Sequence, residues 1–310
     1  MSPLAQAVQD YLSLRRALGF QLRDVGRALV GFVAFLDQQG ASAITIPLAL
    51  GWAQATSSPH PAEWARRLSY VRGFARYWSA TDPRTEIPPW GVLPHPPHRA
   101  RPYLYTDEEI GRLLEAARHL PPASGLRGWT YGCLLGLLAV TGLRISEALH
   151  LHPTDVDWAE ATLTIHGTKF GKTRLVPLHA SSLTVLAEYA RRRDDVLAGR
   201  PTPRFFISAR GRPLEVSAVR RTFYALSRQT GLRGPQASHG PRLHDFRHRF
   251  AVQTLMQWYR AGQDVERRLP VLSTYLGHGH IRDTYWYLTA CPELMGLATM
   301  RLERRWEERA

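Results

Sequence analysis

Apolar residues recur every three or four positions through the first part of the chain, which is the spacing of one helix face. Gly19 and Gly40 follow two of these apolar stripes, at positions where a left-handed glycine commonly ends a helix. The pattern predicts four helices, over residues 4–18, 25–39, 47–54 and 61–78.

Proline then interrupts the helical pattern. Residues 87–102 read IPPWGVLPHPPHRARP, a composition typical of a semi-rigid extended linker. Beyond it, Thr106 can cap a new helix, with Glu109 at the third position of a capping box. We therefore expect an N-terminal helical domain at 1–86, a linker at 87–102 and a second domain at 103–310.

The second domain mixes helical and alternating patterns. An apolar run predicts a buried helix over 129–141 that Gly142 stops. Short alternating segments at 161–166 and 174–179 predict a β-hairpin. Further helices are expected at 180–198, 215–230, 243–261, 264–277 and 281–290, with a short strand at 204–208 and an amphipathic tail helix at 292–310. The fold class is mainly α with a small β-hairpin or sheet.

Charge indicates the kind of partner. The formal net charge is +14, a surplus that folding does not need and that a polyanion such as DNA would use. An arginine-rich coding bias is the alternative. Two cysteines cannot build a disulfide framework, and the sequence shows neither a signal peptide nor an apolar run of membrane-spanning length. We expect a cytoplasmic, nucleoid-associated protein without membrane contact.

Three short stretches carry candidate chemistry. In TGLRISE (141–147), Arg144 lies where a helix begins and can bind an anion, or it can simply pair with Glu147. In LHDFRHRF (243–250), His244 and Arg247 share one helix face. LGHGHIRDTYWYLT (276–289) contains two histidines and two tyrosines, and such tyrosines are usually core or interface aromatics.

A metal site is the alternative for the second stretch, because His244 and His248 have the spacing of two ligands on a helix. No cysteine or acidic cluster with ligand spacing accompanies them, so we expect no metal.

In this order and spacing, the motifs resemble the tyrosine recombinase (phage integrase) family over about residues 103–290. The resemblance implies a catalytic domain of that fold, and the N-terminal helices look like the family's core-binding (SAM-like) domain. It implies that two arginines hold the scissile phosphate of DNA, that a hairpin lysine and two histidines assist, and that a tyrosine attacks. The matching residues are Arg144, Lys169, His244, Arg247, His278 and Tyr287.

Proton chemistry supports this set. Lys169 and Lys172 are the only lysines among 40 basic residues, and both lie between the predicted strands. Arginine holds its protons too tightly to act as a general acid near neutral pH, whereas lysine can be tuned to donate one. A tyrosine hydroxyl also needs a proton acceptor, for which His244 is the candidate.

Two assignments keep an alternative. In the family a glycine usually follows the hairpin lysine, whereas Phe170 stands after Lys169 here, so Lys172 remains open as the acid. Tyr285 is a second candidate nucleophile, two residues from Tyr287 and so nearly on the opposite face of a helix.

The expected function is site-specific DNA recombination through a 3′-phosphotyrosine and a Holliday junction, without metal or nucleotide cofactor. The resemblance implies a homotetramer on double-stranded DNA with inverted-repeat core sites, linked by exchange of the tail helix at 292–310; docking of that tail on its own domain is the alternative. We favour an element-borne integrase or transposase. The alternatives are a type IB topoisomerase-like enzyme and a non-catalytic DNA-binding regulator with the same fold.

Overall fold

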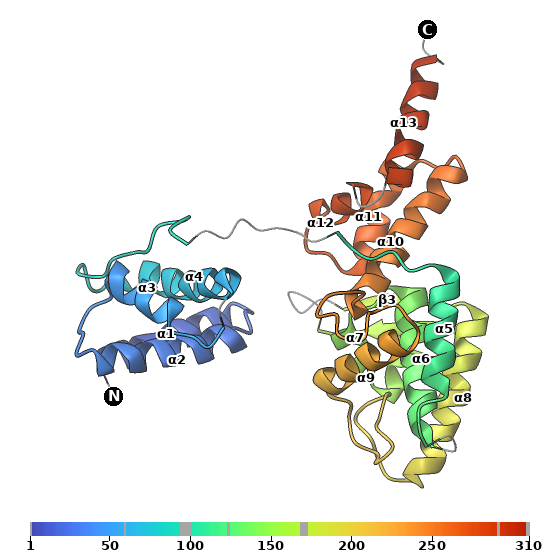
Figure 1. Ribbon diagram of the computed structural model, residues 1–310, viewed down its shortest axis with the longest axis horizontal. Coiled ribbons are helices and arrows are strands. Elements are labelled where there is room, and N and C mark those ends of the chain that lie inside the picture. The colour runs from blue at the N-terminus through green and yellow to red at the C-terminus, as the bar shows by residue number, and fades with distance from the viewer. Residues whose placement is uncertain are drawn as a thin grey trace. The chain divides into compact units, whose positions relative to one another are not determined.

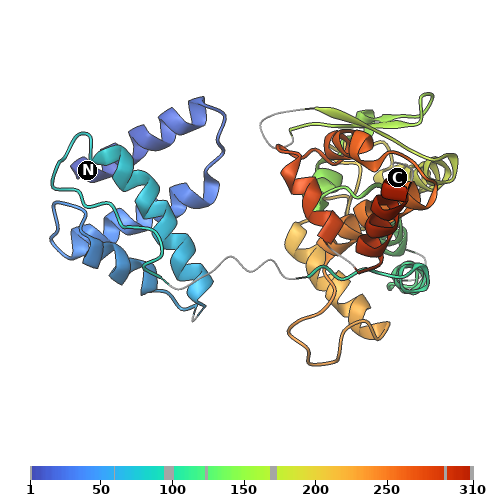
Figure 2. The ribbon, with the colours of Figure 1, turned by 90° about the horizontal axis from the view of Figure 1, so that it is seen from above.

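The chain divides into two compact units, Met1–Arg99 and Ala100–Ala310, in the computed structural model. Each has its own hydrophobic core and is described by itself (Figure 1 and Figure 2). The structure describes residues 2–58, 60–93, 101–122, 125–167, 173–289 and 292–307, without the side chains of residues 289, 304 and 305.

The N-terminal unit is built from four helices whose apolar faces meet in one core. Their bounds are α1 (Pro3–Ala17), α2 (Arg23–Gln38), α3 (Ile46–Gln54) and α4 (Pro61–Trp78). Phe32 of α2 and Phe74 of α4 are fully buried, and Trp52 of α3 packs edge-on against Phe32 with ring centroids 5.2 Å apart. The four predicted helices are confirmed.

The first residues of the proline-rich segment pack on this unit. Arg72 of α4 is buried and donates from Nε to the Pro88 carbonyl at 2.7 Å and from Nη2 to the Pro89 carbonyl at 2.9 Å. Its guanidinium also lies over the Trp90 ring, and Leu93 packs against the core. The segment 87–93 is therefore held by α4, and residues 94–100 lie outside the described residues.

Helices dominate the C-terminal unit as well. They are α5 (Asp107–Arg118), α6 (Leu126–Thr141), α7 (Ile145–His150), α8 (Ala180–Leu197), α9 (Val216–Gln229), α10 (Leu243–Arg260), α11 (Val265–Leu276), α12 (Arg282–Tyr285) and α13 (Pro292–Glu307), with short 3-10 turns η1 (Pro153–Asp155) and η3 (Trp286–Thr289). The predicted capping box of α5 is present, because Thr106 Oγ1 accepts from Glu109 N–H and the Glu109 carboxylate accepts from Thr106 N–H.

Helix α6 begins three residues before the predicted start at 129. The sequence there contains Gly125 and Gly128, which favour a turn. A Cβ on Gly128 would lie 2.3 Å from the Arg118 carbonyl, so this glycine lets α6 approach the end of α5. Close packing of two helices therefore explains a glycine that the sequence pattern assigns to a loop.

The sheet has three antiparallel strands in the order β1-β2-β3. The predicted hairpin is confirmed as β2 (Thr162–Ile165) and β3 (Arg174–Pro177), with Ile165 opposite Arg174. The first strand, β1 (Val156–Asp157), has only two residues, too few for a pattern of period two to reveal it. The expected strand at 204–208 is limited to one isolated bridge, Ile207 to Pro213, and its aromatic residues fill the core instead.

The predicted helix at 281–290 is confirmed in its first part as the short α12, but it then continues as the 3-10 turn η3. Tyr287 therefore lies in a tighter turn than an α-helix provides. Helices α10, α11 and α13 and the turn η3 share a second core in this unit. From this core α13 extends away from the rest of the unit (Figure 1).

Candidate active site

Arg144 and Arg247 are brought together by the turn between α6 and α7. Gly142 ends α6 in the predicted left-handed conformation with φ of 62°. Two residues later Arg144 caps the start of α7, where the Glu147 carboxylate accepts from its backbone N–H at 2.9 Å. Arg247 of α10 donates from Nη1 to the Gly142 carbonyl at 2.9 Å. One arginine therefore holds the turn that positions the other.

The C-terminal end of α11 binds three arginines through three successive carbonyls. Tyr275 accepts from Arg174 Nε at 2.7 Å, Leu276 from Arg247 Nη2 at 2.5 Å, and Gly277 from Arg144 Nη2 at 3.3 Å. The last carbonyls of a helix have no partner within it, and they lie at the negative end of its dipole. This end of α11 therefore attracts cations and places the three guanidiniums side by side.

Glu147 is the acidic partner of this cluster. Arg144 Nη1 donates to it at 2.8 Å, so the local pairing we left open is present. Arg174 donates to both of its oxygens, at 3.1 Å and 2.8 Å. Burial alone would raise the pKa of Glu147, but hydrogen bonds and charge from Arg174 and Arg144 outweigh it and lower the pKa to about 2. Glu147 therefore stays ionised.

Arg247 and Arg144 differ in exposure. Arg247 is 1% exposed, and burial together with the charge of Arg144 lowers its pKa to about 10, which leaves it charged at neutral pH. The side chain of Arg144 is 30% exposed despite its contacts. Arg144 can thus meet an anion from solvent, while Arg247 forms the buried wall behind it.

Helix α10 begins at Leu243 because Asp245 accepts from the Arg242 backbone N–H at 2.8 Å. This start places His244 in the first turn, and its ring contacts that of His248 with centroids 4.6 Å apart. Burial of part of the ring and the charge of Arg247 lower the pKa of His244 to about 4. The lowered pKa leaves the His244 ring, which is exposed at this end of α10, neutral at pH 7.

His278 follows Gly277, whose left-handed φ of 66° ends α11. Its Nδ1 lies 2.7 Å from the buried Thr284 hydroxyl. Burial, then the charges of Arg247 and Arg144, lower the pKa of His278 to about 4. The imidazole is therefore neutral at pH 7 and held in one orientation by Thr284.

The two tyrosines have different environments. Tyr285 is 48% exposed, whereas Tyr287 is 3% exposed. The ring of Tyr287 stacks near that of His278, with centroids 5.9 Å apart and planes at 20°, and it also contacts the ring of His248 at 5.6 Å. This geometry favours Tyr287 over Tyr285 as the residue that acts with the arginines.

Lys169 and Lys172 lie outside the described residues. The strands that lead to them are described, and Arg174 at the start of β3 reaches Glu147 and the end of α11. The base of the hairpin is therefore attached directly to the arginine cluster.

Arg174 is a site residue that we did not predict. Its sequence signal is the alternation of β3, in which Leu175 is 63% exposed and Val176 is fully buried. Arg174 falls on the same face as Val176, where an apolar residue is expected. A charged residue at a core-facing strand position indicates a buried partner, and here that partner is Glu147.

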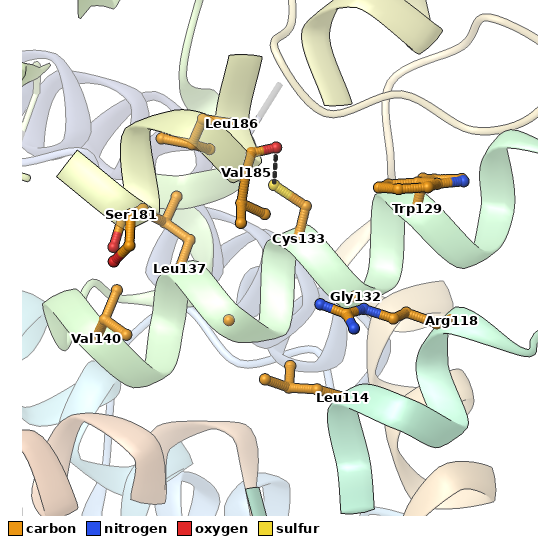
Figure 3. Close-up of a pocket in the computed structure, with 12 residues that line it drawn as sticks. Leu114, Arg118, Trp129, Gly132, Cys133, Leu137, Val140, Ser181, Val185 and Leu186 are labelled. Atoms are coloured by element: carbon orange, nitrogen blue, oxygen red, sulfur yellow. Dashed lines mark hydrogen bonds between the residues drawn. The ribbon is translucent and has the colours of Figure 1, made fainter. Parts of the chain in front are cut away.

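An apolar groove lies elsewhere in this unit, on the face of α6 between α5 and α8 (Figure 3). Its volume is about 240 Å³, and among the described residues that line it Arg118 alone is charged. Burial raises the pKa of the Cys133 thiol in this groove to about 12, so the thiol is unreactive. Within the described ranges, no three His, Cys, Asp or Glu side chains converge as metal ligands, and no helix is long and apolar enough to cross a membrane.

We expect the His278 imidazole to titrate near pH 4 rather than near its ordinary 6.5. Between these values the unfolded chain binds the proton that the folded protein excludes. Lowering the pH from 6.5 to 4 therefore lowers the free energy of unfolding. Side-chain NMR of the free protein, with His278→Gln to assign the signal, measures this pKa; a value near 6.5 would contradict the burial described.

The model of the phage integrase family matches residues 104–293. A Sinorhizobium fredii protein, y4rB, whose name marks it as a candidate integrase/recombinase, is 58% identical over 313 residues and covers 100% of both chains. Tyrosine recombinase XerD of Mycobacterium tuberculosis is 32% identical over 225 residues, which span 72% of this chain and 68% of XerD.

Solved structures share the fold at lower identity. The Tn1549 transposon integrase in complex with transposon right end DNA has a TM-score of 0.68 at 15% identity, over 98% of this chain and 99% of that chain. A lambda integrase tetramer bound to a Holliday junction has a TM-score of 0.60 at 17% identity, over 92% of this chain and 76% of that chain.

Proposed function

This chain belongs to the phage integrase family of tyrosine recombinases, and from that membership we propose that it is a site-specific DNA recombinase of the integrase or transposase type. The observation that carries the proposal is the convergence of Arg144, Arg247, His278 and Tyr287 around the end of α11. A buried tyrosine beside neutral imidazoles and two arginines suits attack on a phosphodiester.

In the proposed cleavage step, the Tyr287 oxygen attacks the scissile phosphorus and the bond to the 5′-oxygen breaks. Tyr287 becomes joined to the 3′-phosphate, its proton passes to His244, and the leaving 5′-oxygen takes a proton from Lys169. Arg144 and Arg247 stabilise the charge that develops on the nonbridging oxygens. The reverse reaction with a 5′-hydroxyl from another duplex rejoins the strands.

The two neutral histidines fit this scheme. A protonated imidazole could not accept the tyrosine proton, and the lowered pKa of His244 keeps it available as a base at pH 7. His278 contacts the face of Tyr287 and is itself held by Thr284, so we assign it to orienting the tyrosine and the phosphate. The phosphotyrosine retains the energy of the broken bond, so the scheme uses no nucleotide.

We assign DNA binding to both units. The N-terminal unit would act as a core-binding domain, with exposed arginines such as Arg23 and Arg27 near phosphates, and the net charge of +14 supports contact with a polyanion. We propose a homotetramer acting on two duplexes with inverted-repeat sites, through a Holliday junction, on chromosomal DNA in the cytoplasm. The solved lambda integrase tetramer on a Holliday junction supports this assembly by analogy of fold.

The tail helix α13 is the element that we propose to link protomers. Its first half docks on its own domain, because Leu294 is fully buried and Glu293 pairs with Arg260. Further along, Leu302 is 47% exposed and Trp306 is 63% exposed. These apolar side chains at the far end of α13 are available to a neighbouring copy, while the near end remains attached in cis.

Replacing Leu302 and Trp306 together by alanine should leave binding to one site unchanged and lower pairing of two sites and recombination by about 10-fold or more, because the buried contact with the neighbour is lost. Gel shifts on single and paired sites measure the two steps. Thr299→Ala with Glu303→Ala is the matched control, since both are exposed polar positions of the same helix. Normal recombination by the Leu302/Trp306 variant would exclude exchange through α13.

The direct test of the function uses duplexes made from inverted repeats that flank the gene, nicked so that cleavage traps the covalent complex. We expect a 3′-linked adduct on these substrates and strand exchange between two intact sites. Relaxation of supercoils without exchange would support the topoisomerase alternative. Binding without any adduct would support the regulator alternative and contradict the proposal.

A further inference from the structure

Arg174 is a third arginine at the site, and the proposed reaction gives it no role. It begins β3, and its side chain is 8% exposed. Its Nη1 and Nη2 donate to the two oxygens of Glu147 at 3.1 Å and 2.8 Å, and its Nε donates to the Tyr275 carbonyl at 2.7 Å. Each of its three nitrogens therefore has a protein acceptor, so Arg174 has little capacity left for a phosphate.

Arg144 uses its donors differently. Only Nη1 reaches Glu147, at 2.8 Å, and Nη2 makes a longer contact of 3.3 Å with the Gly277 carbonyl. The side chain keeps 30% of its surface exposed. Arg174 thus occupies Glu147 on both oxygens, while Arg144 touches it on one and retains donors for an incoming anion.

The geometry also fixes Arg174 in place. A Cβ at Gly277 would lie 2.7 Å from Arg174 Nη1, so this guanidinium fills the space directly beneath the turn that precedes His278. The contact with Tyr275 sets it one carbonyl before that of Arg247 and two before that of Arg144. Arg174 is therefore the first of the three arginines along the end of α11.

A buried carboxylate that loses its partner must find another positive charge or be neutralised. Without Arg174, the nearest cation for Glu147 is Arg144, which could turn both donors of its fork onto the carboxylate. The Arg144 guanidinium would then be fully paired with Glu147 and turned away from the phosphate.

We propose that Arg174 is a positioning residue, which occupies Glu147 so that Arg144 remains directed at the scissile phosphate. This inference rests on the proposed recombinase function. The hairpin would then have two roles. It contains the two lysines, and its strand β3 supplies Arg174 as the counter-ion of Glu147.

The test measures single-turnover cleavage of a nicked suicide duplex by the full chain. Arg174→Gln should cleave about 100-fold more slowly, the size of effect that misplacement of a reacting group produces. DNA binding should be unchanged. The double variant Glu147→Gln/Arg174→Gln should recover at least about 10-fold of that loss, because the carboxylate that captures Arg144 is gone. Arg174→Lys, which keeps the charge without the fork, should fall between wild type and Arg174→Gln.

If Arg174 only stabilises the fold, the result should differ. Removing the Glu147 charge as well would then slow cleavage further or leave it as slow as in Arg174→Gln. A double variant no faster than Arg174→Gln would therefore overturn the proposal, as would wild-type cleavage by Arg174→Gln. A substrate with a 5′-phosphorothiolate should not restore Arg174→Gln; full restoration would mean that Arg174 acts through the hairpin lysine instead.

Two controls keep the outcomes separate. Arg191→Gln removes an exposed arginine of α8 that pairs with Glu188, and it should cleave like wild type. Wild type must itself form the adduct. If it does not, the recombinase function fails, whereas an active wild type with an unaffected Arg174→Gln rejects only the role of Arg174. Thermal melting of each variant identifies loss of folding, in which case Arg174→Lys provides the comparison.

Discussion

Phenylalanine in place of Tyr287 is expected to abolish covalent attachment to DNA while leaving DNA affinity unchanged. The ring of Tyr287 is 3% exposed and packs against His248 and His278, and phenylalanine keeps those contacts. Only the attacking oxygen is lost, so the expected fall in cleavage is about 10,000-fold or more, as for removal of other enzymatic nucleophiles. A nicked suicide duplex resolved on a denaturing gel measures the adduct.

Tyr285→Phe is the matched control for this prediction, because it removes the same atom two residues away from an exposed ring. We expect this variant to trap DNA at the wild-type rate. If Tyr287→Phe still traps DNA and Tyr285→Phe does not, the assignment of the nucleophile is wrong.

The second large effect is expected at Lys169. Lys169→Arg keeps the charge but removes a transferable proton, so cleavage should fall about 100- to 10,000-fold, the usual contribution of a general acid. A 5′-phosphorothiolate substrate should restore cleavage by this variant, because sulfur leaves without being protonated. Single-turnover cleavage of the oxygen and sulfur substrates measures the difference.

Lys172→Arg serves as the comparison, since it makes the same change three residues away in the same hairpin. If the sulfur substrate rescues Lys172→Arg and not Lys169→Arg, the acid is Lys172. Wild-type activity of Lys169→Arg on ordinary DNA would remove the proton-donor argument.

Local signals in the sequence predicted the end of α6, which positions Arg144, and the start of α5. The left-handed Gly142 and the capping box of Thr106 and Glu109 depend on residues within a few positions of each other, and both are present as expected. The helical period likewise revealed α10, and with it the shared face of His244 and Arg247. Features that depend on residues a few positions apart, such as helix ends and helix faces, can therefore be predicted from the sequence.

Contacts between residues that are far apart in the chain could not be predicted from the sequence. Arg174 meets Glu147 across 27 positions and Tyr275 across 101, and no local period records such a pairing. The strand β1 was missed because two residues carry no alternation. The different environments of Tyr285 and Tyr287 were not visible in the sequence either, because the helix expected at 281–290 gives way to the 3-10 turn η3.

The N-terminal unit shows a related limit. Proline predicts an extended segment from residue 87, but it does not say which surface the segment follows. Arg72 holds the segment on α4 by donating to the carbonyls of Pro88 and Pro89. Neither proline has a backbone N–H with which to join regular secondary structure. A buried arginine on α4 thus holds residues 88 and 89 against this unit.

Covalent attachment of DNA to Tyr287 can be measured directly by mass spectrometry of the trapped complex. After cleavage of a suicide duplex, nuclease trimming and trypsin digestion, the modified peptide should span residues 283–301, which contain both Tyr285 and Tyr287. Fragmentation of that peptide locates the nucleotide remnant. We expect the phosphate on Tyr287; a phosphate on Tyr285 or on any other residue would show that Tyr287 is not the nucleophile.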